Sequence, residues 1–359
     1  MKILLIANKD VTLYLARREF IETLIKLNHK VFILCPYGEK LAYFESIGAT
    51  LINYKIDRRG MNPIKEIKLI VIYRKVLKSI RPDYTFTYTI KPNLYTGLIA
   101  NFINVKYFPT VTGLGSSISN RGFKKFLISI LMKLSFKNAE AIFFQSQHNK
   151  SWYEQEINNK TKTILVNGSG VNLVKYNYFE PEISKITTFL FLGRIMKEKG
   201  IDELLYAAQL LKIKYGDLIQ IKIAGFLEDK YYKKLSQMQD KNIIEYLGFV
   251  DDTYQIIRLS SAIVLPSYHE GLSNVLLEAQ AVGRPVIASK ISGCIETFID
   301  GESGYSVKEK NGDDLFLQME KFHLLSFELK QKMGRIGRNH VEKNFNRDDV
   351  LKKYLSIIK

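Results

Sequence analysis

The sequence predicts an α/β protein of two domains, each built on a doubly wound parallel sheet. The chain has 359 residues, which is more than a single hydrophobic core normally organises. Short apolar runs alternate with helical periodicities along both halves, as in sheets wound by crossover helices. Asn167–Glu182, rich in Asn, Tyr and Gly, is the best linker candidate. We therefore expect one domain at residues 1–167 and a second at 168–346.

The first half contains seven apolar runs of the length and composition expected for buried parallel strands. These strands are predicted at Ile3–Ala7, Val31–Leu34, Thr50–Asn53, Tyr84–Tyr88, Tyr107–Val111, Ala141–Gln145 and Thr163–Val166. Helices are predicted between them, near residues 12–27, 64–80, 93–103, 122–137 and 148–156. A helix between consecutive strands allows those strands to run parallel.

The second half repeats this alternation. Its strands are predicted at Thr188–Leu192, Ile219–Ala224, Ile243–Tyr246, Ala262–Leu265 and Val286–Ala288. Its helices are predicted near 201–214, 229–239, 252–259, 274–282, 313–323 and 327–343, and residues 347–358 are amphipathic. Neither half carries a dinucleotide-binding fingerprint or a P-loop, so dehydrogenase and ATPase activities lose their main support.

The charge is concentrated in the first half. Residues 1–165 hold 26 basic and 11 acidic side chains, a net charge of +15, whereas residues 166–359 hold 27 and 25, a net charge of +2. The N-terminal half should therefore seek a polyanionic surface, either nucleic acid or anionic lipid. No apolar run approaches the roughly 18 residues of a membrane-spanning helix, and Ile3–Ala7 is too short for a signal peptide core. Two cysteines in opposite halves argue against a disulfide framework, so a cytoplasmic location is expected.

The segment from Pro266 to Glu278 carries the most chemical information. It follows a predicted buried strand and enters a helix whose expected cap is Ser273. Glu270 in the loop and Glu278 in the second helical turn should converge on one crevice, and Asn274 shares a helix face with Glu278. Free amides at the same helix start favour an anion. Carboxylates beside such amides suit a ligand with hydroxyls and phosphates, and a sugar nucleotide is the obvious candidate.

A second motif follows the strand Thr188–Leu192. Gly193 lets a ligand approach the backbone, and Arg194 and Lys199 are placed to close on a diphosphate near a helix start. Arginine supplies a planar fork of donors, whereas lysine supplies a mobile point charge.

A longer motif surrounds the two glutamates. It consists of Glu270-x7-Glu278 followed by Ala279-Gln280-Ala281-Val282-Gly283-Arg284-Pro285-Val286-Ile287-Ala288-Ser289. This motif resembles the donor-site signature of retaining family-four glycosyltransferases, the glycosyl transferases of group 1. Gly193–Gly200 resembles the same family's G-R-x-x-x-x-K-G element. The resemblance implies a GT-B fold, in which two doubly wound domains face a cleft. The domain at 1–167, joined by a returning helix at 347–359, would bind the acceptor, and the domain at 168–346 would bind the donor.

The resemblance also assigns roles in a hexosyltransferase that uses a UDP-sugar. Arg194 and Lys199 would stabilise the leaving diphosphate, with Glu278 on the ribose and Glu270 on the transferred sugar. The donor-binding set also includes Gly193, Phe249, Val250, Gly271, Leu272, Ser273 and Asn274. Catalysis would rest on Glu270, Arg194 and Lys199. The chain contains no Asp-x-Asp, so we expect transfer without a metal ion or a cofactor. Asp251-Asp252 is expected to cap the following helix instead.

Three further elements are similar to a narrower subgroup, the transferases that extend undecaprenyl-diphosphate-linked sugars, and most closely to N-acetylgalactosaminyltransferases that act on lipid-linked diacetylbacillosamine. They are Asp57–Pro63, Lys91–Asn93, and the Thr112-Gly113-Leu114-Gly115 turn with the later Leu134–Ala139. The resemblance implies that Arg58, Arg59 and Lys91 engage the acceptor's diphosphate.

The turn that holds Gly113 and Gly115 has two open interpretations. It either exposes amides to an acceptor phosphate or merely reverses the chain. Family-four enzymes often supply a histidine from the N-terminal domain, but no histidine lies near this turn. We therefore assign no catalytic residue there.

Two predicted helices, 64–81 and 122–137, combine apolar stripes with basic side chains. Such helices either lie in an anionic membrane interface or pack on their own sheet. The charge of the N-terminal half favours the membrane, which predicts a peripheral protein on the inner face of the cell membrane.

Two other classes of function compete with this hypothesis. One is a GT-B enzyme that does not transfer sugar to an acceptor, such as a UDP-sugar 2-epimerase or a phosphorylase. The other is a basic nucleic-acid-binding protein, which the charge alone suggests. The sequence contains no recognised RNA- or DNA-binding module, so we expect no nucleic-acid partner.

Overall fold

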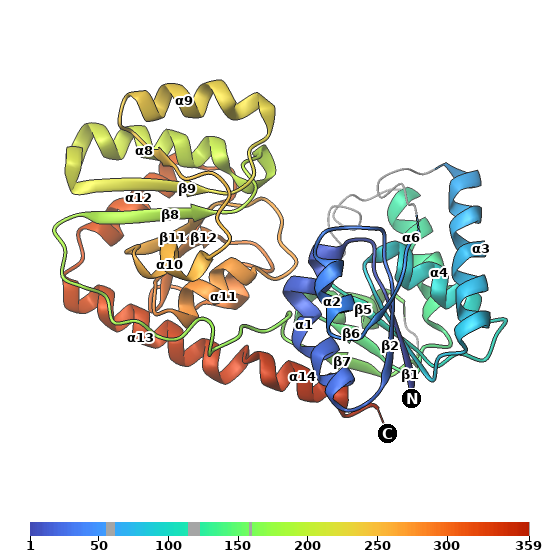
Figure 1. The fold of residues 1–359 in the computed structure, drawn as a ribbon. Helices are drawn as coiled ribbons and strands as arrows, with labels where there is room; N and C mark the ends of the chain where they lie inside the picture. The colour runs from blue at the N-terminus through green and yellow to red at the C-terminus, as the bar shows by residue number, and fades with distance from the viewer. Residues whose placement is uncertain (55–61, 114–122, 158–159, 359) are drawn as a thin grey trace. The chain divides into compact units, whose positions relative to one another are not determined.

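The computed structural model describes residues 1–54, 62–113, 123–157 and 160–358 (Figure 1). The chain folds into two compact units. The N-terminal unit comprises Met1–Ser169 together with Asp349–Lys359, and the C-terminal unit comprises Gly170–Asp348. The chain thus passes between the units twice, within a few residues of each expected domain boundary.

The N-terminal unit is organised by a seven-stranded sheet in which all strands run parallel, in the order β3-β2-β1-β4-β5-β6-β7. Its strands are β1 Lys2–Ile6, β2 Lys30–Leu34, β3 Thr50–Ile52, β4 Tyr84–Tyr88, β5 Tyr107–Val111, β6 Ile142–Phe144 and β7 Thr163–Leu165. The strand order reverses between β1 and β4, which are hydrogen-bonded neighbours. Every residue of β4 and β5 is buried, as expected for a sheet covered on both faces.

Helices cover both faces of this sheet. They are α1 Asp10–Lys26, α2 Leu41–Ser46, α3 Pro63–Ile80, α4 Ile90–Ala100, α6 Phe123–Phe136 and α7 Gln147–Glu156. Successive side chains of β1 point to opposite faces of the sheet. Leu4 and Ile6 pack on one face against α3 and α4. Ile3 and Leu5 pack on the other face against α1 and α14 (Arg347–Leu355). The α4 helix contacts both α3 and α6.

The C-terminal helix α14 packs on the N-terminal unit through Tyr354. This side chain is buried, and its ring stacks on Phe143 with 4.2 Å between centroids. Its hydroxyl lies 3.1 Å from both the Arg17 guanidinium and the Thr110 hydroxyl. The last turns of the chain therefore complete the core of the N-terminal unit.

The C-terminal unit has a six-stranded parallel sheet in the order β10-β9-β8-β11-β12-β13. Its strands are β8 Thr187–Leu192, β9 Ile219–Ala224, β10 Glu245–Tyr246, β11 Ala262–Leu265, β12 Val286–Ser289 and β13 Gly304–Val307. Its helices are α8 Ile201–Tyr215, α9 Tyr232–Asp240, α10 Thr253–Arg258, α11 Asn274–Ala281, α12 Gly312–His323 and α13 Phe327–Asn344. The strand order reverses between β8 and β11. The prediction of two doubly wound parallel sheets is confirmed.

Several local predictions differ from the structure. Strand β13 and helix α2 were not expected, and β10 is two residues long rather than four. The α4 helix begins at Ile90, so Lys91 and Pro92 lie in its first turn, where proline is tolerated because its missing N–H would have no helical partner. Asp252 stands at the cap position of α10, but its side chain makes no capping hydrogen bond, so the prediction of a side-chain cap there is wrong.

Candidate active site

Two loops meet at the carboxyl ends of β8 and β11. These strands are neighbours, with Ala262 opposite Phe189 and Ile263 opposite Leu190. The loop after β8 spans residues 193–200, and the loop after β11 spans residues 266–273. Because the strand order reverses between these two strands, their loops diverge to opposite faces and leave a crevice, which is where parallel α/β sheets bind ligands.

An ion pair joins the two loops. The ammonium group of Lys199 donates to the Oε1 atom of Glu270, and both side chains are largely buried, at 19% and 13% exposed. A backbone hydrogen bond also joins the two loops: the Tyr268 N–H donates to the Glu198 carbonyl oxygen at 2.9 Å. The cation and the carboxylate predicted from separate motifs are therefore in direct contact.

The close approach of these loops depends on glycine. Gly200 has a φ of +71°, and a Cβ atom placed on it would lie 2.0 Å from the carbonyl oxygen of Pro266. Gly225, which follows β9, has a φ of +137°, and its Cβ would lie 1.8 Å from the Gly193 carbonyl oxygen. Any side chain at either position would push a loop away from its neighbour.

The α11 helix begins directly after the second loop. The Ser273 hydroxyl accepts a hydrogen bond from the Leu276 N–H at 3.5 Å, so the predicted cap is confirmed. The first amides of the helix have no partner within the helix and can meet an anion. Gly271, Leu272 and Asn274 are partly buried around this helix start, and Glu278 lies one turn beyond Asn274.

Glu278 lies close to the two segments that connect the units. The Tyr176 hydroxyl, which lies 2.8 Å from the Thr253 hydroxyl, acts on its carboxyl group together with the charges of Arg347 and Lys175. Burial nevertheless dominates and raises the pKa of Glu278 to about 7, while Arg347, Lys175 and Tyr176 oppose the rise. The motif identified Glu278, but no local signal marked its partners, which lie about 100 residues before it and 70 after it along the chain.

The connecting segments pair with each other beside Glu278. The Val171 N–H donates to the Phe345 carbonyl oxygen at 2.8 Å, and the Arg347 N–H donates to the Val171 carbonyl oxygen at 3.1 Å. The Arg347 guanidinium also donates to the Gly170 carbonyl oxygen at 3.1 Å. Arg347 therefore belongs both to this pairing and to the electrostatic surroundings of Glu278.

The remaining predicted donor residues lie at the same edge of the sheet. Arg194 is exposed, and within the described part of the chain it makes no ion pair, so its charge is available. Phe249 is 54% exposed and stacks on Phe226 with 4.4 Å between ring centroids, while Val250 is partly buried. Phe226 was not among the predicted residues, although its position directly after Ala224-Gly225 at the end of β9 was a usable signal.

The predicted acceptor residues are only partly described. Arg58, Arg59 and Gly115 lie outside the described residues. Gly113 follows β5 and lines a small, mainly apolar cavity with Thr89 and Asn93 from the start of α4, and with Met132 and Phe136 of α6.

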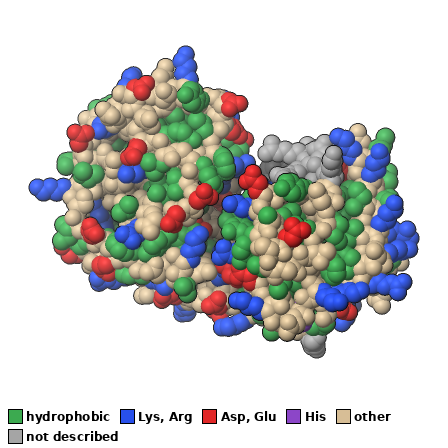
Figure 2. All heavy atoms as spheres, in the orientation of Figure 1, with side chains coloured by type: hydrophobic (Ala, Val, Ile, Leu, Met, Phe, Trp, Pro, Cys, Tyr) green, Lys and Arg blue, Asp and Glu red, His purple; other side chains and the backbone are tan. Residues whose placement is uncertain are grey.

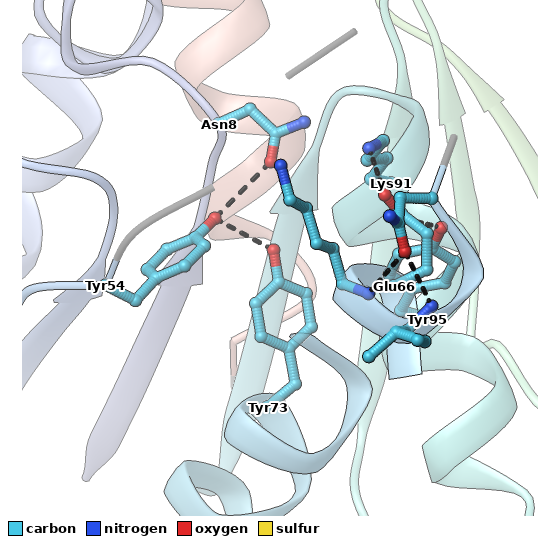
Figure 3. A network of polar contacts seen from close by, with 9 residues as sticks. Asn8, Tyr54, Glu66, Tyr73, Lys91 and Tyr95 are labelled. Carbon is cyan, nitrogen blue, oxygen red and sulfur yellow. Dashed lines mark hydrogen bonds and ion pairs between the residues drawn. The ribbon is translucent and has the colours of Figure 1, made fainter. Parts of the chain in front are cut away.

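Lys91 is paired with Glu66, which was not among the predicted residues. Its ammonium group lies 2.7 Å from the Oε1 atom of Glu66 on α3, and the Tyr95 hydroxyl donates to the same carboxylate (Figure 3). Burial and the neighbouring Glu66 raise the pKa of Tyr95. Lys91 is thus held between α3 and α4, and an acceptor phosphate would have to compete with Glu66 for it.

A second polar cluster lies nearby, at the carboxyl end of β1 (Figure 3). The Tyr54 hydroxyl lies 2.9 Å from the Tyr73 hydroxyl and donates to the Ala7 carbonyl oxygen at 3.1 Å. The Asn8 side chain is 3.4 Å from the same Tyr54 hydroxyl. This edge of the N-terminal sheet therefore offers hydroxyl and amide groups next to the Lys91–Glu66 pair.

The comparisons with known proteins cover nearly the whole chain. Residues 179–340 match the family described as glycosyl transferases group 1, and residues 2–146 match the family described as glycosyl transferase 4-like. The chain is 28% identical to N,N'-diacetylbacillosaminyl-diphospho-undecaprenol alpha-1,3-N-acetylgalactosaminyltransferase of Campylobacter jejuni, over 99% of this chain and 98% of that protein. It is also 28% identical to the capsular polysaccharide biosynthesis glycosyltransferase CapM of Staphylococcus aureus, over 91% and 88% of the two chains.

Solved structures share the fold at lower identity. Anabaena HepE, in complex with UDP and glucose, superposes with a TM-score of 0.81 at 13% identity and covers 100% of this chain and 99% of its own. A glycosyltransferase from Rickettsia africae gives a TM-score of 0.78 at 19% identity, with 99% and 97% coverage.

The raised pKa of Glu278 makes a prediction about stability and pH. A carboxyl group whose pKa is higher in the folded state than in the unfolded state disfavours folding once it ionises, so its effect grows as the pH rises from about 4.5 to 7. Glu278→Gln should therefore increase the free energy of unfolding by about 3 kcal/mol at pH 8, and by much less at pH 5. Urea titrations at the two pH values measure this difference. The exposed Glu302 provides a control as Glu302→Gln, and a Glu278→Gln protein no more stable than wild type at pH 8 would contradict the argument.

Proposed function

Because this chain belongs to the group 1 glycosyltransferases and has their GT-B fold, we propose that it transfers a hexose or N-acetylhexosamine from a UDP-sugar to a polyprenyl-diphosphate-linked saccharide. The transfer retains the configuration of the sugar, needs no metal ion, and serves the synthesis of a surface polysaccharide or glycan. One observation carries the donor half of this proposal: Lys199 and Glu270 meet at the reversal of strand order, beside the first amides of α11.

The charge distribution suits the departure of a nucleoside diphosphate. When the bond between the sugar and the diphosphate breaks, positive charge develops on the anomeric carbon and negative charge on the leaving oxygen. Arg194, Lys199 and the first amides of α11 are placed to stabilise that negative charge, which is the role that a metal ion plays in other transferases. Glu278 accepts hydrogen bonds from the ribose hydroxyls.

The Lys199–Glu270 pair would respond to a bound donor. The two side chains satisfy each other in a largely buried position. An incoming diphosphate competes for Lys199, and Glu270 is then free to accept hydrogen bonds from the sugar hydroxyls. Donor binding therefore exchanges one ion pair for two interactions with different parts of the same ligand.

The acceptor part of the proposal rests on the relatives and on the N-terminal unit. The Campylobacter protein is named for an undecaprenyl-diphosphate-linked acceptor, and the Staphylococcus protein for capsule synthesis. In this chain, Lys91 with the nearby Tyr54 and Tyr73 hydroxyls offers groups that can bind a phosphorylated saccharide. Arg58 and Arg59 remain proposed partners of the acceptor diphosphate.

We further propose that the N-terminal unit docks on an anionic membrane surface. On α3, Ile64, Ile67 and Val71 are exposed at helical spacing, and on α6, Phe126, Ile130 and Leu134 are exposed opposite the buried Met132 and Phe136. Exposed basic residues accompany them: Lys65, Lys68, Arg74, Lys75, Lys78, Lys133 and Lys137. Figure 2 shows basic side chains along the edge of the unit where α3 lies. Among the described helices, none is long and apolar enough to cross a bilayer.

A product assay tests the reaction as a whole. The protein is incubated with a panel of UDP-sugars and a short-chain polyprenyl-diphosphate saccharide, in EDTA, and the lipid product is analysed by mass spectrometry. We expect one UDP-sugar to add one sugar to the acceptor at an unchanged rate in EDTA. Strict dependence on added Mg²⁺ or Mn²⁺ would refute metal independence, and conversion of the UDP-sugar without transfer would support an epimerase instead.

Kinetics with single variants test the donor residues. Glu278→Ala should raise the apparent KM for the donor, because it removes ribose hydrogen bonds made in both the ground state and the transition state. Arg194→Ala and Lys199→Ala should mainly lower kcat, because the negative charge that they stabilise grows toward the transition state. Lys197→Ala, on the same loop and exposed, is the control. Wild-type constants in all three variants would eliminate the assignment.

Vesicle binding tests the membrane surface. Each Lys or Arg near an anionic surface contributes about 1 kcal/mol, so changing Lys124, Lys125, Lys133 and Lys137 to Gln should strongly weaken binding to anionic vesicles. The same change should slow transfer to the lipid-linked acceptor more than hydrolysis of the UDP-sugar. A matched control changes four lysines of the C-terminal unit, Lys230, Lys233, Lys234 and Lys241. Equal vesicle binding by both quadruple variants would show that α6 is an ordinary packing helix.

A further inference from the structure

The C-terminal unit has a second cavity, at the edge of its sheet opposite to the candidate donor site. The cavity has a volume of about 180 Å³ and lies where β8, β11 and β12 begin, with Thr187, Ser261 and Pro285 in its wall. The candidate donor site lies where β8 and β11 end. A six-residue strand such as β8 is roughly 20 Å long, so the two sites are separate.

Three cations contribute to the wall of this cavity. Arg258 ends α10, Arg284 follows α11, and Lys330 lies in the first turns of α13. Within the described residues, none of the three forms an ion pair. Among the lining residues, the only carboxylate is Glu182, which is exposed at the rim. Glu180 acts on Arg284 only through its charge, without an ion pair. Because buried or half-buried charges are normally paired, three cations without ion pairs favour an anion in the cavity.

The two arginines are packed into the wall, and within the described residues the guanidinium of Arg258 makes no hydrogen bond. Arg284 is only 1% exposed, and its guanidinium donates to the carbonyl oxygens of Phe179 at 2.8 Å and Arg258 at 2.6 Å. The guanidinium of Arg258 lies over the Phe179 ring, 4.5 Å from its centroid. The Nε atoms of both arginines are buried and have no acceptor among the described residues. Fixed guanidinium groups with spare donors are typical of phosphate recognition.

Lys330 completes the cationic wall from the other side. Its ammonium group donates to the His323 carbonyl oxygen at 2.9 Å and lies 3.4 Å from the Thr187 hydroxyl. Burial lowers the pKa of Lys330, as expected for a cation without a counter-ion. Ser184, Ser260 and Ser261 add hydroxyl groups to the lining.

We propose that this cavity binds a small anion bearing a phosphate group, either inorganic phosphate or a phosphomonoester of a sugar. The volume equals the share of roughly six water molecules in the liquid, which accommodates a phosphate with a short organic substituent. Arg258 and Lys330 supply the charges, and the serine and threonine hydroxyls supply further hydrogen bonds. The site is independent of the proposed UDP-sugar site, although α11 runs between the two: Ser273 caps its start, and Arg284 follows its end.

Calorimetric titration of the full-length protein tests this site, with inorganic phosphate and a hexose phosphate as separate probes at constant ionic strength. The titrations use the Arg194→Gln/Lys199→Gln variant as background, because it removes the two cations that would bind phosphate at the donor site. We expect both Lys330→Gln and Arg258→Gln to weaken phosphate binding at least fivefold in this background. Lys332→Gln, exposed on the same helix and outside the cavity, should bind as the background does. Tighter binding of the hexose phosphate would identify the ester as the ligand, and equal binding would identify the free ion.

Two results would overturn the proposal. One is the absence of phosphate binding in the Arg194→Gln/Lys199→Gln background when wild type binds, which would place all binding at the donor site. The other is equal affinity in the background protein and in both cavity variants. Thermal melting without phosphate identifies a variant that does not fold, and Arg258→Gln and Lys330→Gln then serve as independent tests, because they lie on different helices.

Discussion

The candidate active site depends on the parallel pairing of β8 with β11. These strands are separated by about 70 residues of sequence, yet their pairing places the loop with Lys199 against the loop with Glu270. Gly200 allows that contact because a side chain there would strike the backbone of Pro266. The ion pair is therefore a consequence of strand order and of one glycine. The same strands begin at the cavity lined by Arg284 and Lys330, so one sheet supports a polar site at each edge.

Glu278 links the candidate site to the two segments that connect the units, because charged residues of both segments act on its carboxyl group. Its carboxyl group is held where burial raises its pKa to about 7, against the attraction of Arg347 and Lys175. Both cations come from the segments that carry the chain between its units, and these segments are hydrogen-bonded to each other through Val171. In the proposed donor site, this carboxylate, which burial makes costly to ionise, would gain hydrogen-bond donors from a bound ribose. The buried Glu278 carboxylate would thus lower the stability of the protein without ligand, and hydrogen bonds from the ligand would offset that cost.

Much of the fold and of the donor site could be predicted from sequence because the signals are local. The Ser273 cap and the alternation of strands and helices each follow from residues close together in the chain. The partners of those residues could not be predicted in the same way. Glu66 neutralises Lys91 across 25 positions, and Arg347 acts on Glu278 across 69, so only the folded chain brings them together. The cationic cavity could not be predicted from sequence for the same reason, because Arg258, Arg284 and Lys330 belong to no common motif.

We propose that Lys199 and Glu270 act as one unit that a nucleoside diphosphate separates. Calorimetric titration of UDP into wild type, Lys199→Gln, Glu270→Gln and the double variant tests it most directly. We expect Lys199→Gln to weaken UDP binding at least tenfold, because UDP, unlike the UDP-sugar, already carries the full negative charge of the departed leaving group. We also expect that Glu270→Gln leaves the affinity unchanged or increases it, because Lys199 loses its competing partner, and that the two effects are not additive. Equal UDP affinity in all four proteins would contradict the account.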